Sequence, residues 1–161
     1  MTRPNAFDAD CSGGYSDEDP DGYRCGEGPF GKEAGGKELA VRLFELPPGQ
    51  TLCPYHYEYV EEWLLVIAGE VRVRTPAGVA AARAGDLVCF PAGPDGGHNV
   101  WNERDDTARV VMFSSAAEPA VAVYPDSDKI GVWTSNERDH WRFRGADGHA
   151  DYYDGEVPPK H

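Results

Sequence analysis

Residues 49–69 read GQTLCPYHYEYVEEWLLVIAG, and this stretch decides how we expect the chain to fold. It places His56, Glu58 and Glu62 close together, directly before an apolar run over residues 63–68. A short apolar run that ends at a glycine is typical of a buried strand. Imidazole and carboxylate groups are ligands that several divalent transition metals accept. The stretch therefore predicts a metal site on a β scaffold.

Short strands separated by frequent turns extend on both sides of this stretch. Residues 38–46, ELAVRLFEL, nearly alternate between apolar and charged side chains and end at Pro47; a strand is favoured there, and a short helix is the alternative. Turn signals recur about every 8 to 12 residues, which predicts an all-β sandwich or barrel. The expected strands cover residues 38–46, 51–59, 61–68, 71–75, 79–83, 87–90, 98–101, 109–114 and 120–124, with a further edge strand starting over residues 23–25.

Composition divides the chain into three segments. Residues 1–37 read as an N-terminal arm and edge segment, residues 38–124 as the barrel, and residues 125–161 as a C-terminal extension. The first 20 residues or so are polar and acidic, so we expect a mobile arm, or one that orders only against a partner subunit. The extension carries aromatic residues among its charges, and we expect it to pack on the barrel or on a partner subunit; these residues are Trp133, Trp141, Tyr152 and Tyr153.

The charge balance excludes some partners. The chain has 28 acidic and 15 basic residues and a formal charge of -13. Phosphates would be repelled, so non-specific nucleic-acid binding and attachment to an anionic membrane surface are not expected. No apolar run approaches the roughly 18 residues of a transmembrane helix, and the first residues lack the apolar core of a signal peptide. We therefore expect a cytoplasmic protein.

The cysteines show no spacing typical of a structural zinc site. Cys11, Cys25, Cys53 and Cys89 form no C-x-x-C pair, and in a reducing cytoplasm the expectation is four free thiols. Cys89 lies in the apolar run over residues 87–90 and is predicted to be buried. Cys53, three residues before His56, has two interpretations: a packed strand residue, or a thiol that lines the pocket.

The opening stretch resembles the first motif of the cupin superfamily. Gly49 is followed by His56, Glu58, Glu62 and Gly69 in the order of that motif. Six residues, where the motif has five, separate Gly49 from His56. Glu58 stands where the second histidine of the motif usually lies. This chain therefore departs from the family pattern at one expected ligand.

A second stretch, over residues 85–102, is similar to the second cupin motif. Its matching residues are Gly85, Pro91, Gly93, His98 and Asn102, with two extra residues between Gly93 and His98. The two motifs occur in the right order. The segments EEWLLV, VCFPAGP and DYYDGE also resemble a bacterial cupin subgroup whose function is unassigned.

The resemblance implies a double-stranded β-helix, that is, a jelly-roll barrel, here with N- and C-terminal arms. It implies one divalent transition metal ion (Fe, Mn, Ni or Zn) inside the barrel and a homodimer. His56, Glu62 and His98 are its implied ligands. Glu58 could be a fourth ligand, a general base in catalysis, or a solvated side chain.

Two functions of different class are compatible with this resemblance. The first is a metal-dependent enzyme that acts on a small organic molecule by oxygenase, isomerase or lyase chemistry. The alternative is a non-catalytic module that binds a small sugar or acid. In both cases we expect an apolar cavity with the metal at one end and a glycine-rich loop, residues 92–97, at its rim. The residues predicted to face inward are Leu64, Val66, Val88, Phe90, Val100 and Met112.

Overall fold

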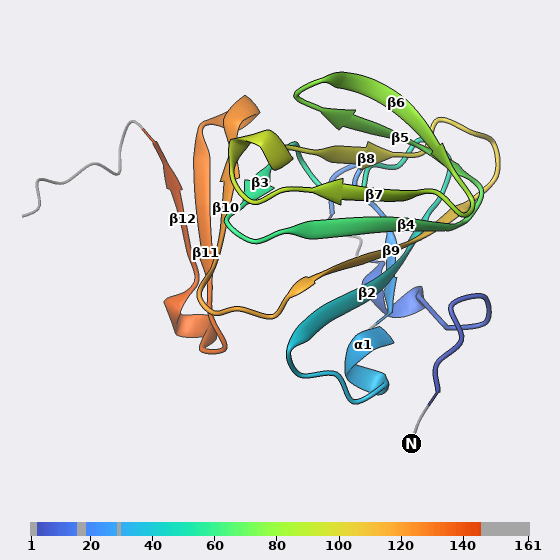
Figure 1. Cartoon of the computed structure of the whole chain (residues 1–161), viewed down its shortest axis with the longest axis horizontal. Coiled ribbons are helices and arrows are strands. Elements are labelled where there is room, and N and C mark those ends of the chain that lie inside the picture. The colour runs from blue at the N-terminus through green and yellow to red at the C-terminus, as the bar shows by residue number, and fades with distance from the viewer. Residues whose placement is uncertain (1–2, 16–18, 29, 146–161) are drawn as a thin grey trace, which may run out of the picture.

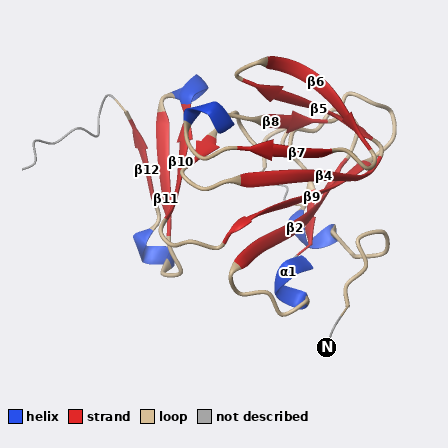
Figure 2. Cartoon of the chain, in the orientation of Figure 1, coloured by secondary structure: helices blue, strands red, loops and turns tan. Residues whose placement is uncertain are grey.

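The computed structural model describes residues 3–15, 19–28 and 30–145. Strands dominate these residues, and the helical segments are short (Figure 2). The strands are β1 (Gly26–Gly28), β2 (Leu39–Leu46), β3 (Tyr57–Glu58), β4 (Glu62–Ala68), β5 (Glu70–Thr75), β6 (Gly78–Arg83), β7 (Leu87–Phe90), β8 (Asn99–Trp101), β9 (Ala108–Ser115), β10 (Ala120–Tyr124), β11 (Lys129–Trp133) and β12 (Trp141–Arg144). The helical segments are α1 (Phe30–Glu33) and the 3-10 turns η1 (Ser12–Gly14), η2 (Pro94–Gly96), η3 (Pro125–Ser127) and η4 (Glu137–Asp139).

The strands form three antiparallel sheets. The largest has the order β1-β2-β9-β4-β7, a second has the order β6-β5-β8, and the third has the order β12-β11-β10-β3. Strands β10, β11 and β12 stand at one end of the molecule, across the direction of β4 and β7 (Figure 1). The architecture confirms the predicted all-β jelly-roll barrel.

One apolar core lies between the first two sheets. Leu64 and Val66 of β4 are 0% and 1% exposed, and they pack with Val71 of β5, Phe90 of β7 and Val100 of β8. Alternate residues of each strand point to the same face, so the alternating pattern of the sequence becomes this core. Four of the six residues predicted to face inward are fully buried, and Val88 and Met112 are half-buried.

Gly69 makes the tight connection from β4 to β5. Its φ of 76° lies in the left-handed region, which favours glycine. A Cβ at this position would also lie 3.0 Å from the Cα of Ala108 on β9. Glycine therefore ends the apolar run at this point because both the turn and the neighbouring strand require it.

The extended piece predicted over residues 51–59 is only partly a strand. Tyr57–Glu58 forms β3, whereas Thr51 and His56 make isolated β-bridges to Trp101 and His98. Residues between them bend, so strict alternation of side chains does not hold there. The edge strand predicted from residue 23 begins instead at Gly26.

Cys89 is exposed, so its predicted burial is wrong. Strand β7 lies at the edge of its sheet, and its residues alternate between buried and exposed. Phe90 points into the core, and Cys89 therefore points outward.

Residues 6–11 pack on the barrel of their own chain, whereas we expected a mobile arm or one that orders only against a partner subunit. Cys11 is 1% exposed and packs with Leu43 and Val111. Arg109 of β9 donates hydrogen bonds to the carbonyl oxygens of Ala6, Phe7 and Ala9. Its guanidinium also pairs with Glu45. These contacts hold the segment because a single arginine satisfies several of its backbone acceptors.

Hydrogen-bonded pairing crosses both predicted segment boundaries. Strand β1 joins the sheet of β2, and strands β11 and β12 continue the sheet of β10. Residues 146–161, which include Tyr152 and Tyr153 of the predicted extension, lie outside the described residues. In the part of the chain that the structure describes, no helix is long and apolar enough to cross a membrane.

Candidate metal centre

His56 and His98 face each other across an isolated antiparallel bridge. The amide of His56 donates to the carbonyl of His98 at 3.0 Å, and the amide of His98 donates to the carbonyl of His56 at 2.7 Å. Their ring centroids lie 4.6 Å apart. The bridge therefore brings together two histidines that are 42 positions apart in the chain.

Both imidazoles are fixed in the same way. Nδ1 of His56 lies 3.0 Å from the carbonyl oxygen of Pro54, and Nδ1 of His98 lies 2.9 Å from that of Gly96. A carbonyl accepts only, so each Nδ1 carries the proton and each Nε2 presents a lone pair. This is the arrangement in which a second hydrogen bond orients a metal-binding histidine.

Glu62 lies between the two Nε2 atoms. Its Oε2 is 3.8 Å from Nε2 of His56 and 3.8 Å from Nε2 of His98. It is the first residue of β4, and its side chain is 14% exposed. Three donor atoms from three segments of the chain thus converge on one point.

Nε2 of His98 is buried and has no hydrogen-bond partner in the described structure. The residue is 0% exposed, and the ring of Phe90 stacks on it. A buried polar atom without a partner costs on the order of 1–3 kcal/mol. A cation between His98, His56 and Glu62 would satisfy this atom.

The electrostatics of the site follow from its burial. Burial, together with nearby His56, lowers the pKa of His98 to about 4, and burial also lowers the pKa of His56. Burial raises the pKa of Glu62 to about 8, and the neighbouring Glu58 contributes to this shift. The imidazoles are therefore neutral at neutral pH and able to donate their lone pairs.

Glu58 joins the same cluster. One donor atom from each of His56, Glu58 and Glu62 lies within 4.8 Å of the others. Burial raises the pKa of Glu58, and the nearby Arg42 guanidinium opposes this shift. The structure thus brings together all four residues singled out in the sequence.

Cys53 lies beside the two histidines of the site. Its sulfur and nitrogens of His56 and His98 lie within 4.8 Å of one another. The side-chain amide of Asn99 donates a hydrogen bond to the carbonyl oxygen of Cys53. Burial raises the pKa of the Cys53 thiol. Of the two interpretations, this placement favours a thiol that lines the site. Regular alternation would separate residues 53 and 56 onto opposite faces, but the bends between them remove that constraint.

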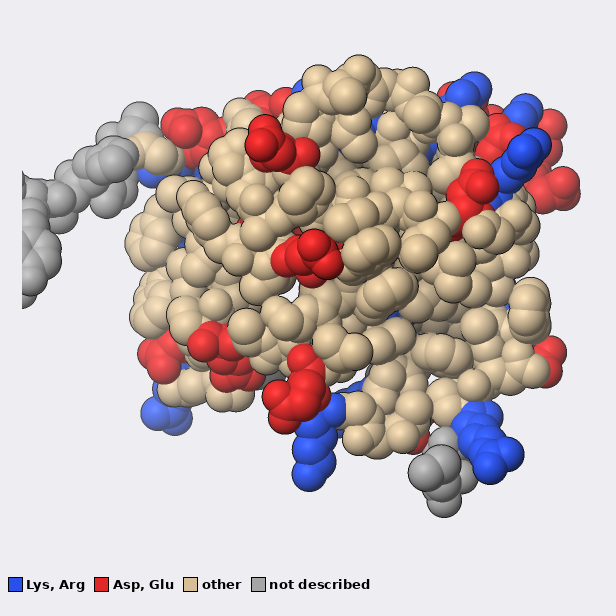
Figure 3. Space-filling view, viewed as in Figure 1, with Lys and Arg blue, Asp and Glu red and all other residues tan. Residues whose placement is uncertain are grey.

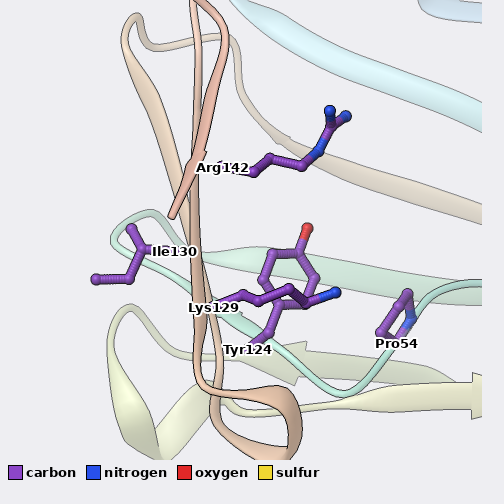
Figure 4. A pocket seen from close by; sticks show the side chains of 5 residues that line it. All are labelled: Pro54, Tyr124, Lys129, Ile130 and Arg142. Atoms are coloured by element: carbon purple, nitrogen blue, oxygen red, sulfur yellow. The ribbon is translucent and has the colours of Figure 1, made fainter. Parts of the chain in front are cut away.

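No motif or spacing in the sequence points to a second neighbour of the site, Tyr124. This last residue of β10 stacks on His56, with ring centroids 5.6 Å apart. It also lines a cavity of about 160 Å³ together with Pro54, Lys129, Ile130 and Arg142 (Figure 4). The six side chains predicted to face inward do not line this cavity, since Leu64 and Val66 pack in the core.

The glycine-rich rim loop is tied to the site. Gly96 accepts the hydrogen bond from His98, and the amide of Gly93 donates to the carbonyl of Glu58 at 2.7 Å. A Cβ at Gly96 would overlap the carbonyl oxygen of Pro91. The loop thus sets the orientation of His98 through its backbone.

Asn102, the last residue of the second motif, has a structural role. It is 0% exposed, and its amide donates to the carbonyls of Leu46 and Asp106 at 2.8 Å each. Its side-chain oxygen accepts from the amide of Arg104. It holds the turn after β8 and the end of β2 together, away from the metal ligands.

Comparisons with known proteins agree with this architecture. The family model described as cupin domain matches residues 42–114. A protein of Acidithiobacillus ferrooxidans, provisionally named a sugar phosphate isomerase, superposes with a TM-score of 0.72 at 21% identity, over 80% of this chain and 81% of that one. A sugar phosphate isomerase from a cupin superfamily of Silicibacter pomeroyi gives 0.71 at 24% identity, over 81% and 82%. The polyketide cyclase RemF of Streptomyces resistomycificus gives 0.59 at 17% identity, over 74% and 83%. No curated protein matches the chain. At these identities, the structural likenesses establish the fold.

Proposed function

Residues 42–114 of this chain are a cupin domain, and from this premise we propose that the protein is a metal-dependent enzyme acting on a small organic molecule. The proposed chemistry is of the oxygenase, isomerase or lyase type. The observation that carries the proposal is the buried Nε2 of His98, which has no hydrogen-bond partner among the described residues and faces a carboxylate shared with His56. A packed, purely structural site would satisfy that atom within the protein.

In this proposal His56, Glu62 and His98 hold one divalent transition metal ion. Two neutral imidazoles with carboxylate oxygen suit Fe, Mn, Ni or Zn. The donor set fits such an ion because both histidines present Nε2 while Nδ1 is bound to a carbonyl. When bound, the ion supplies Lewis-acid polarisation of a substrate oxygen.

Glu58 has two roles within the same proposal. Its carboxyl either completes the ligand set or moves a proton at the substrate. Burial raises the pKa of Glu58, which brings it closer to the range in which a carboxyl both takes up and releases protons near neutral pH. Its Glu58→Gln variant separates the roles, since a ligand loss lowers metal content whereas a proton-transfer loss leaves metal content intact and lowers turnover.

The compared structures support small-molecule chemistry without selecting a reaction. Two carry the name sugar phosphate isomerase and one is a polyketide cyclase. One fold therefore hosts different reactions, as is common for widely used folds. On the face seen in Figure 3, the basic side chains of the described residues are scattered and form no broad basic surface.

The first experiment is elemental analysis of the purified protein by mass spectrometry. We expect about one transition metal per chain, and loss of that metal in His98→Ala. A protein that neither carries a transition metal nor takes one up from added stock would contradict the proposal. A metabolite screen by thermal shift then identifies ligands, because a molecule that binds only the folded state raises the melting temperature. Binding without turnover would favour the alternative, a non-catalytic sugar- or acid-binding module.

We also propose a cytoplasmic homodimer. Three apolar side chains of β11 and β12 are well exposed in the described structure: Ile130 at 38%, Trp141 at 44% and Phe143 at 47%. Ile130 and Phe143 are directly paired across the two strands, so they form a continuous apolar area of the kind that subunit contacts cover. Light scattering coupled to size-exclusion chromatography measures the mass; a monomer at micromolar concentration would contradict the dimer.

A further inference from the structure

The cavity of about 160 Å³ beside Tyr124 is polar on one side. Tyr124, Lys129 and Arg142 extend from the strands to the same side of the sheet, whereas Ile130 points to the other (Figure 4). The strand register explains this, because Lys129 pairs with Tyr124 and Arg142 pairs with Gly131. Residues paired across antiparallel strands, and every second residue along a strand, share a face. A hydroxyl, an ammonium and a guanidinium thus line one cavity.

This cavity shares a wall with the candidate metal centre. The ring of Tyr124 stacks on the ring of His56, with centroids 5.6 Å apart. Pro54, which also lines the cavity, supplies the carbonyl that fixes His56. A small molecule in the cavity therefore lies beside the proposed metal ligand His56.

The two cations of the cavity have no carboxylate partner among the described residues. Among the described residues neither Lys129 nor Arg142 forms an ion pair, although the chain carries a net charge of -13. Six other arginines are paired with carboxylates: Arg24 with Asp21, Arg42 with Glu27, Arg72 with Glu103, Arg74 with Asp126, Arg104 with Glu70 and Arg109 with Glu45. Two unpaired cations at one cavity of so acidic a protein indicate a local preference for anions.

Aromatic rings position both cations. Nζ of Lys129 lies 5.3 Å from the centroid of Tyr124, and Cζ of Arg142 lies 5.7 Å from the centroid of Trp133. A Cβ at residue 131 would overlap the Trp133 ring, so Gly131 makes room for the ring that supports Arg142. These cation–π contacts leave the N–H groups of both side chains available to a ligand.

We propose that Tyr124, Lys129 and Arg142 form a subsite that binds the anionic group, a carboxylate or a phosphate, of the substrate. The inference rests on the proposed metal-dependent function and adds a substrate class to it. Arg142 offers a planar fork of donors to the anion, Lys129 a point charge and Tyr124 a hydroxyl donor. The substrate is thereby an organic acid or a phosphate ester whose uncharged end faces His56 and the metal.

The test is isothermal titration calorimetry of the full chain, with its metal as purified, at constant ionic strength. Inorganic phosphate and acetate are the two probes, and they distinguish a phosphate-binding from a carboxylate-binding subsite. We expect at least one of them to bind and its affinity to fall about tenfold in both Arg142→Ala and Lys129→Ala, as the loss of a charge-assisted hydrogen bond predicts. Arg83→Ala, which removes an equal charge on β6 outside this cavity, should leave the affinity unchanged.

Metal content, measured on the same samples, separates this inference from the proposed function. Full metal content with lost anion binding supports both proposals. Anion binding that is unchanged in both cavity variants, or reduced equally by Arg83→Ala, would overturn the subsite, and so would a wild type that binds neither probe. A loss of metal in the cavity variants would also overturn it, because the effect would then act through the metal centre. Melting temperatures of the variants identify any that fail to fold, and the two cavity variants serve as independent tests.

Discussion

The rings of Phe90 and His98 lie face to face, with centroids 3.8 Å apart and planes inclined by only 5°. Phe90, the last residue of β7, is 2% exposed and points into the core. Its backbone pairs with that of Glu62 on β4. Phe90 thus fixes the ring plane of the proposed ligand His98 and lies next to a second proposed ligand, Glu62. Because neither ring can rotate without displacing the other, the pair orients Nε2 of His98 toward Glu62.

Replacement of Phe90 by leucine should weaken metal binding without removing a ligand. The His98 ring loses the surface that fixes its plane, and loss of such a supporting residue typically lowers metal affinity by about 10- to 100-fold. Competition with a chromophoric chelator measures the affinity. Phe113→Leu is the matched control, since Phe113 stacks on Trp63 of the same sheet and packs in a different apolar cluster from Phe90. Equal affinities of the two variants would show that Phe90 contributes only packing.

The adjacent residues Glu61 and Glu62 should differ sharply in their contribution to metal binding. Glu62→Gln should reduce metal content from about one ion per chain to a small fraction, because an amide is a far weaker ligand than a carboxylate. Glu61→Gln should retain full metal content, since Glu61 is exposed and its carboxylate accepts a hydrogen bond from the indole of Trp63. Elemental analysis of both variants gives the result. Metal retained in Glu62→Gln would remove Glu62 from the ligand set.

Metal binding should release a proton below about pH 8. Burial raises the pKa of Glu62 to about 8 from its ordinary value of 4.5, so the carboxyl is protonated in the metal-free protein at pH 7 and must ionise to bind. His98, with its pKa lowered to about 4 by burial, is already neutral and releases none. Apparent affinity should therefore rise about tenfold per pH unit up to about pH 8 and then level off.

Calorimetry at pH 7 in buffers of different ionisation enthalpy counts the released protons. About one proton per metal ion is expected for the wild type. A pH-independent affinity between pH 6 and 8 would mean that Glu62 is ionised before the metal arrives.

How much of this site the sequence could predict depends on local backbone regularity. Strands β4 and β7 are regular, so alternation correctly placed Leu64, Val66 and Phe90 in the core. The two motifs predict His56 and His98 as neighbouring residues of one site, and the structure places them side by side.

The same reasoning failed where the backbone bends or the contact is long-range. Because the backbone bends between Thr51 and His56, side chains do not alternate regularly there, and the pattern does not predict which way Cys53 points. Tyr124 and Arg142 reach the cavity through strand pairings beyond the resembling motifs, and no local pattern encodes which strand lies next to His56. Cys89 was misplaced because an apolar run alone does not distinguish an edge strand from a central one.

Asn102 should matter for stability and leave the metal site intact. Asn102→Ala removes three hydrogen bonds and leaves the buried carbonyl of Leu46 without this partner. We expect the free energy of unfolding to fall by about 2–3 kcal/mol. Chemical denaturation measures this loss, and metal content per folded chain should stay near that of the wild type. A stability unchanged within about 0.5 kcal/mol would mean that water replaces the side chain.

Cys53 should not be a metal ligand, although its sulfur lies within 4.8 Å of a ring nitrogen of His56 and one of His98. Burial, reinforced by the charges of Glu62 and Glu58, raises the pKa of the Cys53 thiol. Forming the thiolate therefore costs more free energy than ionising Glu62. One oxygen of Glu62, Oε2, is also equally close to both imidazoles. The protein loaded with Co(II) should therefore lack a sulfur-to-cobalt charge-transfer band, and Cys53→Ser should bind the metal as tightly as the wild type. Cys89→Ser, which changes an exposed thiol, is the control. A charge-transfer band that disappears in Cys53→Ser alone would instead assign the site to Cys53, His56 and His98, and the softer donor set would then favour zinc over iron or manganese.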